Sequence, residues 1–73
     1  MPNANTSFTI RLNGEPHEVS TDARLITLIE GLKLNRRRIA IEINHEIVPK
    51  ARWAEVTLSP NDTVEIVNFV GGG

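Results

Sequence analysis

The chain has 73 residues, 40% of them hydrophobic, and a formal net charge of −1. This length limits it to a single domain, and the nearly balanced charge provides no strong field to attract nucleic acid or an anionic membrane. It contains no cysteine, which excludes disulfides, thiolate zinc sites and cysteine nucleophiles. A domain this small buries only about 60% of the surface that its unfolded chain exposes, so there is little room for an enclosed active-site cleft.

A β-hairpin is predicted near the beginning of the chain. Residues 1–6 are polar, and we expect them to form a flexible tail. Over residues 7–12 apolar and polar side chains alternate, which is the period of a strand with one buried face. Asn13 and Gly14 follow at once, and this pair accepts the positive φ angles of a type I′ turn. The return strand is therefore expected over residues 15–20.

One helix is predicted over residues 23–33. Its apolar residues recur at spacings of three, four and seven, which places them on one helical face. These residues are Leu25, Leu28, Ile29 and Leu32. Residues 20–22 have side chains that accept hydrogen bonds from the first backbone N–H groups of a helix, so we expect the cap there. Asn35 is the expected end of the helix.

The second half of the chain alternates short strands with turns. Isoleucines at every second position indicate a strand over residues 39–43. Pro49 cannot donate to a sheet ladder, so the short strand before it ends there. The predicted elements are, in chain order, a basic loop at 36–38, strands at 39–43 and 46–48, one helical turn at 50–55, a short strand at 56–58, a turn at 59–62 and a last strand at 64–70.

Together these elements predict an α+β domain of the β-grasp, or ubiquitin-like, type. The single helix has one apolar face, which must cover one face of a sheet. The hairpin precedes the helix and the other strands follow it, so the simplest arrangement is a mixed sheet of four to five strands with the helix packed across one face. We expect the domain to span residues 7–70, between a flexible tail at 1–6 and a flexible glycine tail at 71–73.

The chain lacks a recognisable catalytic or metal-binding motif. Its serines show no nucleophile-elbow motif, and His17 and His45 have no metal-ligand partner at a recognisable spacing. The arginine triplet at 36–38 is interpreted as a solvated loop, with a partner contact as the alternative, because the net charge and the absence of interleaved aromatic residues argue against nucleic-acid binding. Trp53 is predicted to close the rim of the core, with its N–H bonded to a carbonyl or to water, and an exposed anchor is the alternative. We therefore predict no catalytic residue and no metal site.

The end of the chain is the best candidate for chemistry. The last predicted strand leads directly into Gly71, Gly72 and Gly73. Three extended residues reach about 10 Å beyond a sheet, and without Cβ atoms they can enter a channel too narrow for other residues. The terminal carboxylate is ionised at neutral pH and can attack an activated phosphate. A merely frayed end is the alternative interpretation.

These features resemble the sulfur carriers of thiamine thiazole biosynthesis, which are ThiS-like members of the ubiquitin-like β-grasp proteins. The likeness extends over nearly the whole chain beyond its first six residues. It rests on Asn13-Gly14-Glu15, the apolar helix face, Ile41-Glu42-Ile43-Asn44, Ile47-Val48-Pro49, Trp53, Asp62-x-Val64-Glu65-Ile66 and the Gly-Gly end. The chain departs from the family at Asn61, where glycine is common, but asparagine tolerates the same left-handed conformation. It also ends in three glycines where two would suffice.

The resemblance implies that Gly73 is the reactive residue and that partners recognise Gly71 and Gly72. An adenylyltransferase would use ATP and Mg²⁺ to convert the Gly73 carboxylate to an acyl adenylate. Sulfur from a donor such as a cysteine desulfurase relay would then displace AMP and leave a thiocarboxylate, which thiazole synthase would use. The chain itself is then a protein substrate of its partners, not an enzyme, and it binds no cofactor.

The last strand also predicts a docking surface for partners. Its residues alternate between two faces, so Val67 and Phe69 are left uncovered if Val64 and Ile66 face the helix. Exposed apolar residues close to a functional tail indicate a place where a partner docks. Two other arrangements stay open, namely the opposite assignment of the faces and a Phe69 side chain folded over the rim of the core.

Two other functions are compatible with the same chain end. The small subunit of molybdopterin synthase resembles this fold and also ends in Gly-Gly, and a protein modifier joined through Gly73 to lysines would be activated in the same way. The combination of Asn44, Pro49 and Trp53 favours the thiazole carrier. No secretory signal or membrane-spanning apolar stretch is visible, so we expect a cytoplasmic protein that is monomeric when free.

Overall fold

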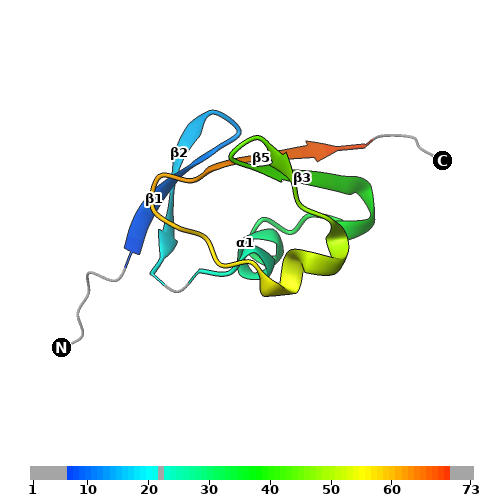
Figure 1. The fold of residues 1–73 in the computed structure, drawn as a ribbon, viewed down its shortest axis with the longest axis horizontal. Helices are drawn as coiled ribbons and strands as arrows, with labels where there is room; N and C mark the ends of the chain where they lie inside the picture. The colour runs from blue at the N-terminus through cyan, green and yellow to red at the C-terminus, as the bar shows by residue number, and fades with distance from the viewer. Residues whose placement is uncertain (1–6, 22, 70–73) are drawn as a thin grey trace.

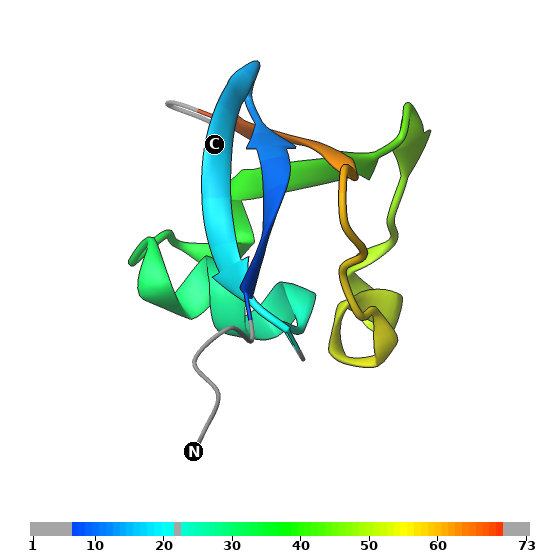
Figure 2. The ribbon, with the colours of Figure 1, turned by 90° about the vertical axis from the view of Figure 1, so that its left-hand side faces the viewer.

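The computed structural model describes residues 7–21 and 23–69. Within them a five-stranded sheet has the strand order β2-β1-β5-β3-β4. The α-helix and the second 3₁₀ helix lie together on one side of this sheet, and Figure 2 shows the same layers after a quarter turn (Figures 1 and 2). The elements are β1 (Ser7–Leu12), β2 (Glu15–Ser20), α1 (Leu25–Gly31), the 3₁₀ helix η1 (Arg36–Arg38), β3 (Ile39–Ile43), β4 (Glu46–Ile47), the 3₁₀ helix η2 (Lys50–Glu55) and β5 (Thr63–Asn68).

The sheet is mixed because β1 and β5, which lie next to each other in it, run parallel. β1 also pairs antiparallel with β2, and β3 pairs antiparallel with both β5 and β4. The last strand of the chain is therefore held on both sides, by β1 near its start and by β3 along its length. The predicted β-grasp arrangement, a mixed sheet with one helix across one face, is confirmed.

The first hairpin has the turn that the sequence predicts. Asn13 and Gly14 both have positive φ angles, 51° and 86°, as a type I′ turn requires. The same asparagine also fastens the hairpin to the last strand. Its side-chain oxygen accepts a hydrogen bond of 2.8 Å from the Ile66 N–H, and its own N–H donates to the Val64 carbonyl at 2.8 Å.

The helix is shorter than predicted at both ends. Of residues 23–33, α1 takes only Leu25–Gly31, because the backbone before it pairs with a distant segment. Arg24 forms an isolated antiparallel bridge with Thr57, so it stays extended and becomes the N-cap. The cap predicted at residues 20–22 is therefore wrong, and among the described residues no side chain caps α1.

The end of the helix also differs from the prediction at Asn35. Lys33 adopts the left-handed conformation, with a φ of 59°, and its N–H donates to the Glu30 carbonyl at 3.1 Å. Asn35 instead begins the next element, where its side-chain oxygen accepts from the Arg37 N–H at 3.0 Å. The basic loop predicted at 36–38 is thus a capped 3₁₀ turn, because the asparagine supplies the acceptor that its first turn lacks.

The remaining predicted elements are confirmed with shifted ends. β4 is one residue shorter than predicted, and the strand predicted at 56–58 is reduced to the single bridge at Thr57. The helical turn at 50–55 is confirmed as η2. The turn at 59–62 is closed by a 3.1 Å hydrogen bond from the Asp62 N–H to the Ser59 carbonyl, and Asn61 within it has a φ of 69°. Asparagine therefore takes the left-handed conformation for which the family commonly has glycine.

A single apolar core lies between the sheet and α1 with η2. Trp53 is 3% exposed, and its indole N–H donates to the Val48 carbonyl at 2.8 Å, so its predicted role at the core is confirmed. The buried apolar residues are Ile10, Ala23, Leu25, Leu28, Ile29, Ile39, Ile41, Trp53, Leu58 and Val64. The strands contribute to this core from one face, and within residues 7–21 and 23–69 no helix covers the other face of the sheet, which we call the open face.

Candidate functional site

The two faces of β5 are assigned as predicted. Val64 is fully buried and Ile66 packs against the core from a partly buried position. Val67 is 55% exposed and Phe69 is 50% exposed. Because half of its surface is exposed, the Phe69 side chain does not close the rim of the core. The described end of the chain thus presents two large apolar side chains to solvent.

A third exposed apolar residue joins them on the open face of the sheet. Ile47 is 70% exposed and pairs directly with Glu42, which in turn pairs with Glu65 of β5. Directly paired residues project from the same face of a sheet, so Ile47 shares this face with Val67. We call Ile47, Val67 and Phe69 the open-face patch. Ile47 is absent from the sequence prediction because a two-residue strand has no period from which to read a face.

Two like charges lie opposite each other beside the open-face patch. Glu42 of β3 and Glu65 of β5 are direct partners in the antiparallel register. Like charges in such a pair repel and destabilise the sheet slightly. The one ion pair within the described residues joins Arg52 to Glu55 at 3.3 Å, so neither of these two glutamates has a basic partner there. The open face therefore combines exposed apolar surface with uncompensated negative charge.

A side-chain network fixes the start of β5. The Asn44 amide group donates to the Asp62 carboxylate at 3.0 Å, and its oxygen accepts from the Thr63 N–H at 2.9 Å. The second carboxylate oxygen of Asp62 accepts from the Ser59 N–H at 2.8 Å. Asn44 itself has a φ of 53°, in the region where asparagine is favoured over most residues. The motif residues Asn44 and Asp62 thus set the position at which the last strand enters the sheet.

The far end of β5 is held by the first 3₁₀ turn. The Phe69 N–H donates to the Arg38 carbonyl at 2.7 Å, and Asn68 pairs with Ile39 at the first position of β3. Backbone hydrogen bonding to the rest of the domain therefore continues to Phe69, the last described residue. Gly71, Gly72 and Gly73 lie outside the described residues, and their roles stay predictions.

Other kinds of site find no support in the described part of the chain. Among residues 7–21 and 23–69, no group of three histidine, cysteine or acidic side chains is placed to hold a metal ion. His17 is partly buried and His45 is exposed in the turn before β4. No helix within these residues is long and apolar enough to cross a membrane.

Known proteins resemble this chain over most of its length. The model of the ThiS family matches residues 10–73. The sulfur carrier protein ThiS of Bacillus subtilis is 38% identical over 65 residues, which cover 88% of this chain and 98% of that protein. The crystal structure of the thiamine biosynthesis protein ThiS of Geobacter metallireducens matches with a TM-score of 0.77 at 26% identity, over 90% of this chain and 100% of that one.

A second kind of relative is much longer than this chain. The thiazole synthase of Magnetococcus marinus is 38% identical over 64 residues, which cover 88% of this chain. The chain spans only 20% of the length of that protein. The family match includes β5, the Asn44 and Asp62 network and the glycine end. On the extent of this match, the chain belongs to the ThiS family.

Proposed function

We propose that the chain is a sulfur carrier protein of thiamine biosynthesis, with the carboxylate of Gly73 as its working group. The observation that supports this function best is the family match, which runs through β5 to Gly73. The likeness to the Bacillus subtilis sulfur carrier covers nearly the whole of both chains. The ThiS match also favours this role over that of the small subunit of molybdopterin synthase. In this role the chain is a substrate of partner enzymes and not an enzyme.

The chemistry that we propose begins with activation of the carboxylate. An oxygen of Gly73 attacks the α-phosphorus of ATP, held with Mg²⁺ by a partner adenylyltransferase, and pyrophosphate leaves. A persulfide sulfur of a donor such as a cysteine desulfurase relay then attacks the acyl carbon and expels AMP. A partner thiol attacks the donor sulfur of the resulting acyl disulfide, which releases the Gly73 thiocarboxylate and leaves a disulfide on the partners. All these thiols come from partners, because this chain has no cysteine.

The open-face patch is the docking surface in this proposal. Val67 and Phe69 lie on the strand that leads to the tail, and Ile47 extends the apolar surface across β4. Exposed apolar residues grouped in this way mark interaction sites. A partner that places a lysine or arginine against Glu42 and Glu65 would also relieve their mutual repulsion. A partner that docks here would therefore need both an apolar surface and a basic side chain.

Thiazole synthase is the proposed acceptor of the sulfur. Two proteins named thiazole synthase, from Magnetococcus marinus and Paramagnetospirillum magneticum, contain a segment that is 38% and 40% identical to this chain. A carrier segment within the same polypeptide as the synthase keeps donor and acceptor at high effective concentration. In this proposal the chain contacts its synthase through the open-face patch and the glycine tail.

The test is the intact mass of the protein after incubation with ATP, Mg²⁺, the adenylyltransferase and a sulfur donor. We expect a fraction with sulfur in place of one oxygen, and fragmentation should assign it to Gly73. A variant with Gly73 replaced by alanine is the matched control, because a Cβ at this position blocks a narrow channel. A mass that stays at that of the bare carboxylate would contradict the proposal. Covalent ladders on a denaturing gel would instead indicate a protein modifier.

A further inference from the structure

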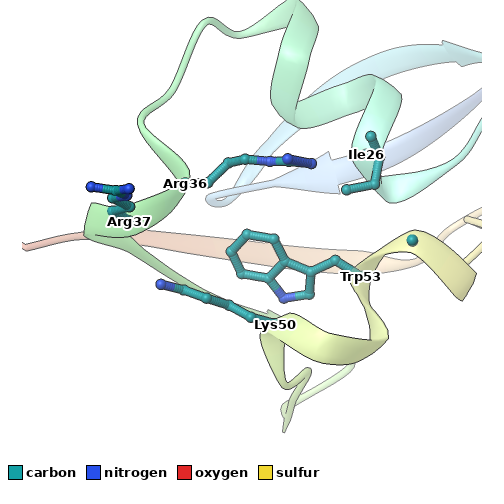
Figure 3. A pocket seen from close by; sticks show the side chains of 6 residues that line it. Ile26, Arg36, Arg37, Lys50 and Trp53 are labelled. Atoms are coloured by element: carbon teal, nitrogen blue, oxygen red, sulfur yellow. The ribbon is translucent and has the colours of Figure 1, made fainter.

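A cationic pocket lies on the helix side of the sheet, away from the open-face patch. It has a volume of about 270 Å³ and is formed by three elements that are separate in sequence, α1, η1 and η2. Its lining residues are Ile26, Arg36, Arg37, Lys50, Trp53 and Ala54. Figure 3 shows the indole of Trp53 between the side chains of Arg36 and Lys50, with Ile26 above the end at which the side chain joins the backbone. The pocket therefore has an apolar floor and a rim of positive charges.

The floor of the pocket is held rigidly. Trp53 is almost completely buried and its N–H is already bonded to the Val48 carbonyl, so it supports the floor and offers a ligand no donor. The partly buried Ile26 and the exposed Ala54 supply the apolar surface that a ligand can reach. The Lys50 ammonium lies 5.9 Å from the centre of the ring, at the outer limit of a cation–π contact. The turn that bears the arginines is fixed by Asn35, whose backbone carbonyl accepts from the Arg38 N–H at 2.9 Å. The site is thus formed before any ligand arrives.

The charges at the rim are not neutralised within the described residues. No acidic side chain lines this pocket among them, and the ion pair that they contain, Arg52 to Glu55, lies elsewhere on η2. Arg36 and Arg37 are both exposed. Three cations around an apolar floor are complementary to a carboxylate attached to an apolar group, because guanidinium groups bind carboxylates with paired hydrogen bonds.

The position of the pocket relates it to the end of β5. The turn that supplies Arg36 and Arg37 also supplies the Arg38 carbonyl to which the Phe69 N–H is bonded at 2.7 Å. The open face bears Val67 near this end and the acidic pair two residues further back along β5, and the other side of the sheet bears the cationic pocket. A protein that surrounds the chain beyond Phe69 meets both surfaces, and their opposite charges fix the orientation in which it binds.

We propose that the cationic pocket is a second docking site, which takes a segment of the tail-binding partner protein in which a carboxylate neighbours an apolar side chain. This inference rests on the proposed function, since that function requires partners that enclose the tail. The carboxylate pairs with Arg36 and Arg37, and the apolar side chain packs against Ile26 and Ala54, next to Trp53. Binding in the pocket then adds to the contact at the open-face patch and rejects partners that lack an acidic group there.

The chain provides its own reporter for this pocket. Trp53 is the single tryptophan of the sequence, so protein labelled with 5-fluorotryptophan gives one ¹⁹F resonance from the pocket floor. We would titrate this protein separately with the thiazole synthase and with the adenylyltransferase of the same organism. The expected result is a shift of the resonance by at least one of them. If neither enzyme moves the resonance, including the case in which both form complexes that leave it in place, the proposal is wrong.

Two double variants with the same change in charge test the role of the arginines. Arg36→Gln with Arg37→Gln removes two charges from the rim, whereas Arg24→Gln with Arg38→Gln removes two exposed charges that do not line the pocket. We expect the first pair to weaken binding about tenfold and the second pair less than about twofold. Because all four side chains are exposed, both proteins should keep the thermal unfolding curve of the wild type. Equal weakening by both pairs would show a general charge effect and overturn the proposal.

Two further measurements separate this proposal from other outcomes. AMP and inorganic phosphate, added without any enzyme, should leave the ¹⁹F resonance in place. A shift caused by either one would mean that the pocket binds a small anion and not a protein segment, and it would overturn the proposal. Transfer of sulfur to Gly73 is measured by mass after ATP, Mg²⁺ and a sulfur donor are added to the sample that contains the adenylyltransferase. If sulfur is transferred to Gly73 but the ¹⁹F resonance does not shift, the docking site is wrong and the proposed function stands. A shifted resonance without any transfer supports the docking site and contradicts the proposed function.

Discussion

The two faces of the sheet in this protein differ in how deeply their side chains are buried. Toward α1 the strands present Ile10, Ile41 and Val64, each at most 1% exposed. On the open face the neighbouring positions bear Val67, exposed over half of its surface, and a pair of facing glutamates. Adjacent residues of one strand therefore alternate between the core and an exposed face. In the proposed function, the exposed residues on β5 and just after it are the ones that meet partners.

The largest expected effect tests the core side of this comparison. Ile41→Ala removes most of a fully buried side chain and should lower the free energy of unfolding by about 3 kcal/mol. Val67→Ala, on the pairing strand but on the open face, should change it by less than about 0.5 kcal/mol. Urea unfolding of the two variants measures the difference. Similar losses in both would mean that the open face is packed in solution and that the two faces are not divided as described.

This division of faces is also the part of the structure that the sequence predicts best. Period-two alternation reports directly which side chains of β3 and β5 face the core. The start of α1 differs from the prediction because Arg24 is bridged to Thr57, which is distant in sequence, so no local pattern indicates the contact. This single backbone bridge overrides the capping preference of the serine and threonine before it.

The candidate site was predicted in part for the same reason. Val67 and Phe69 follow from the period of β5, whereas Ile47 lies on a strand too short to show one. The cationic pocket depends on η1 lying beside η2, and no pattern within either segment indicates that they meet. Periodicity therefore predicts the faces of single elements, while surfaces built from several elements need the tertiary structure.

The next effect tests the open face as a docking surface. Phe69→Asp places a charge in the open-face patch and should weaken binding to the activating enzyme or to thiazole synthase about tenfold, with the fold retained. Thr9→Asp is the matched control, because it adds the same charge to an exposed position on β1 of the same sheet. Isothermal titration calorimetry and thermal unfolding give both quantities. A Phe69→Asp protein that unfolds would assign Phe69 to the core, and unchanged binding would remove the patch from the interface.

The smallest effect concerns the facing glutamates, and its sign distinguishes recognition from stability. Glu65→Gln removes one of two like charges, so the free protein should become more stable by about 0.5 kcal/mol at most, and the gain should shrink as salt is added. Glu15→Gln, an exposed position on β2 whose strand partner is the uncharged Leu12, should show no such gain. The same Glu65 variant should bind a partner several-fold more weakly if that partner sets a cation against the pair. A gain in stability with a loss of binding would indicate that the repulsion is maintained for the complex, whereas a gain with unchanged binding would leave the acidic pair without a role in recognition.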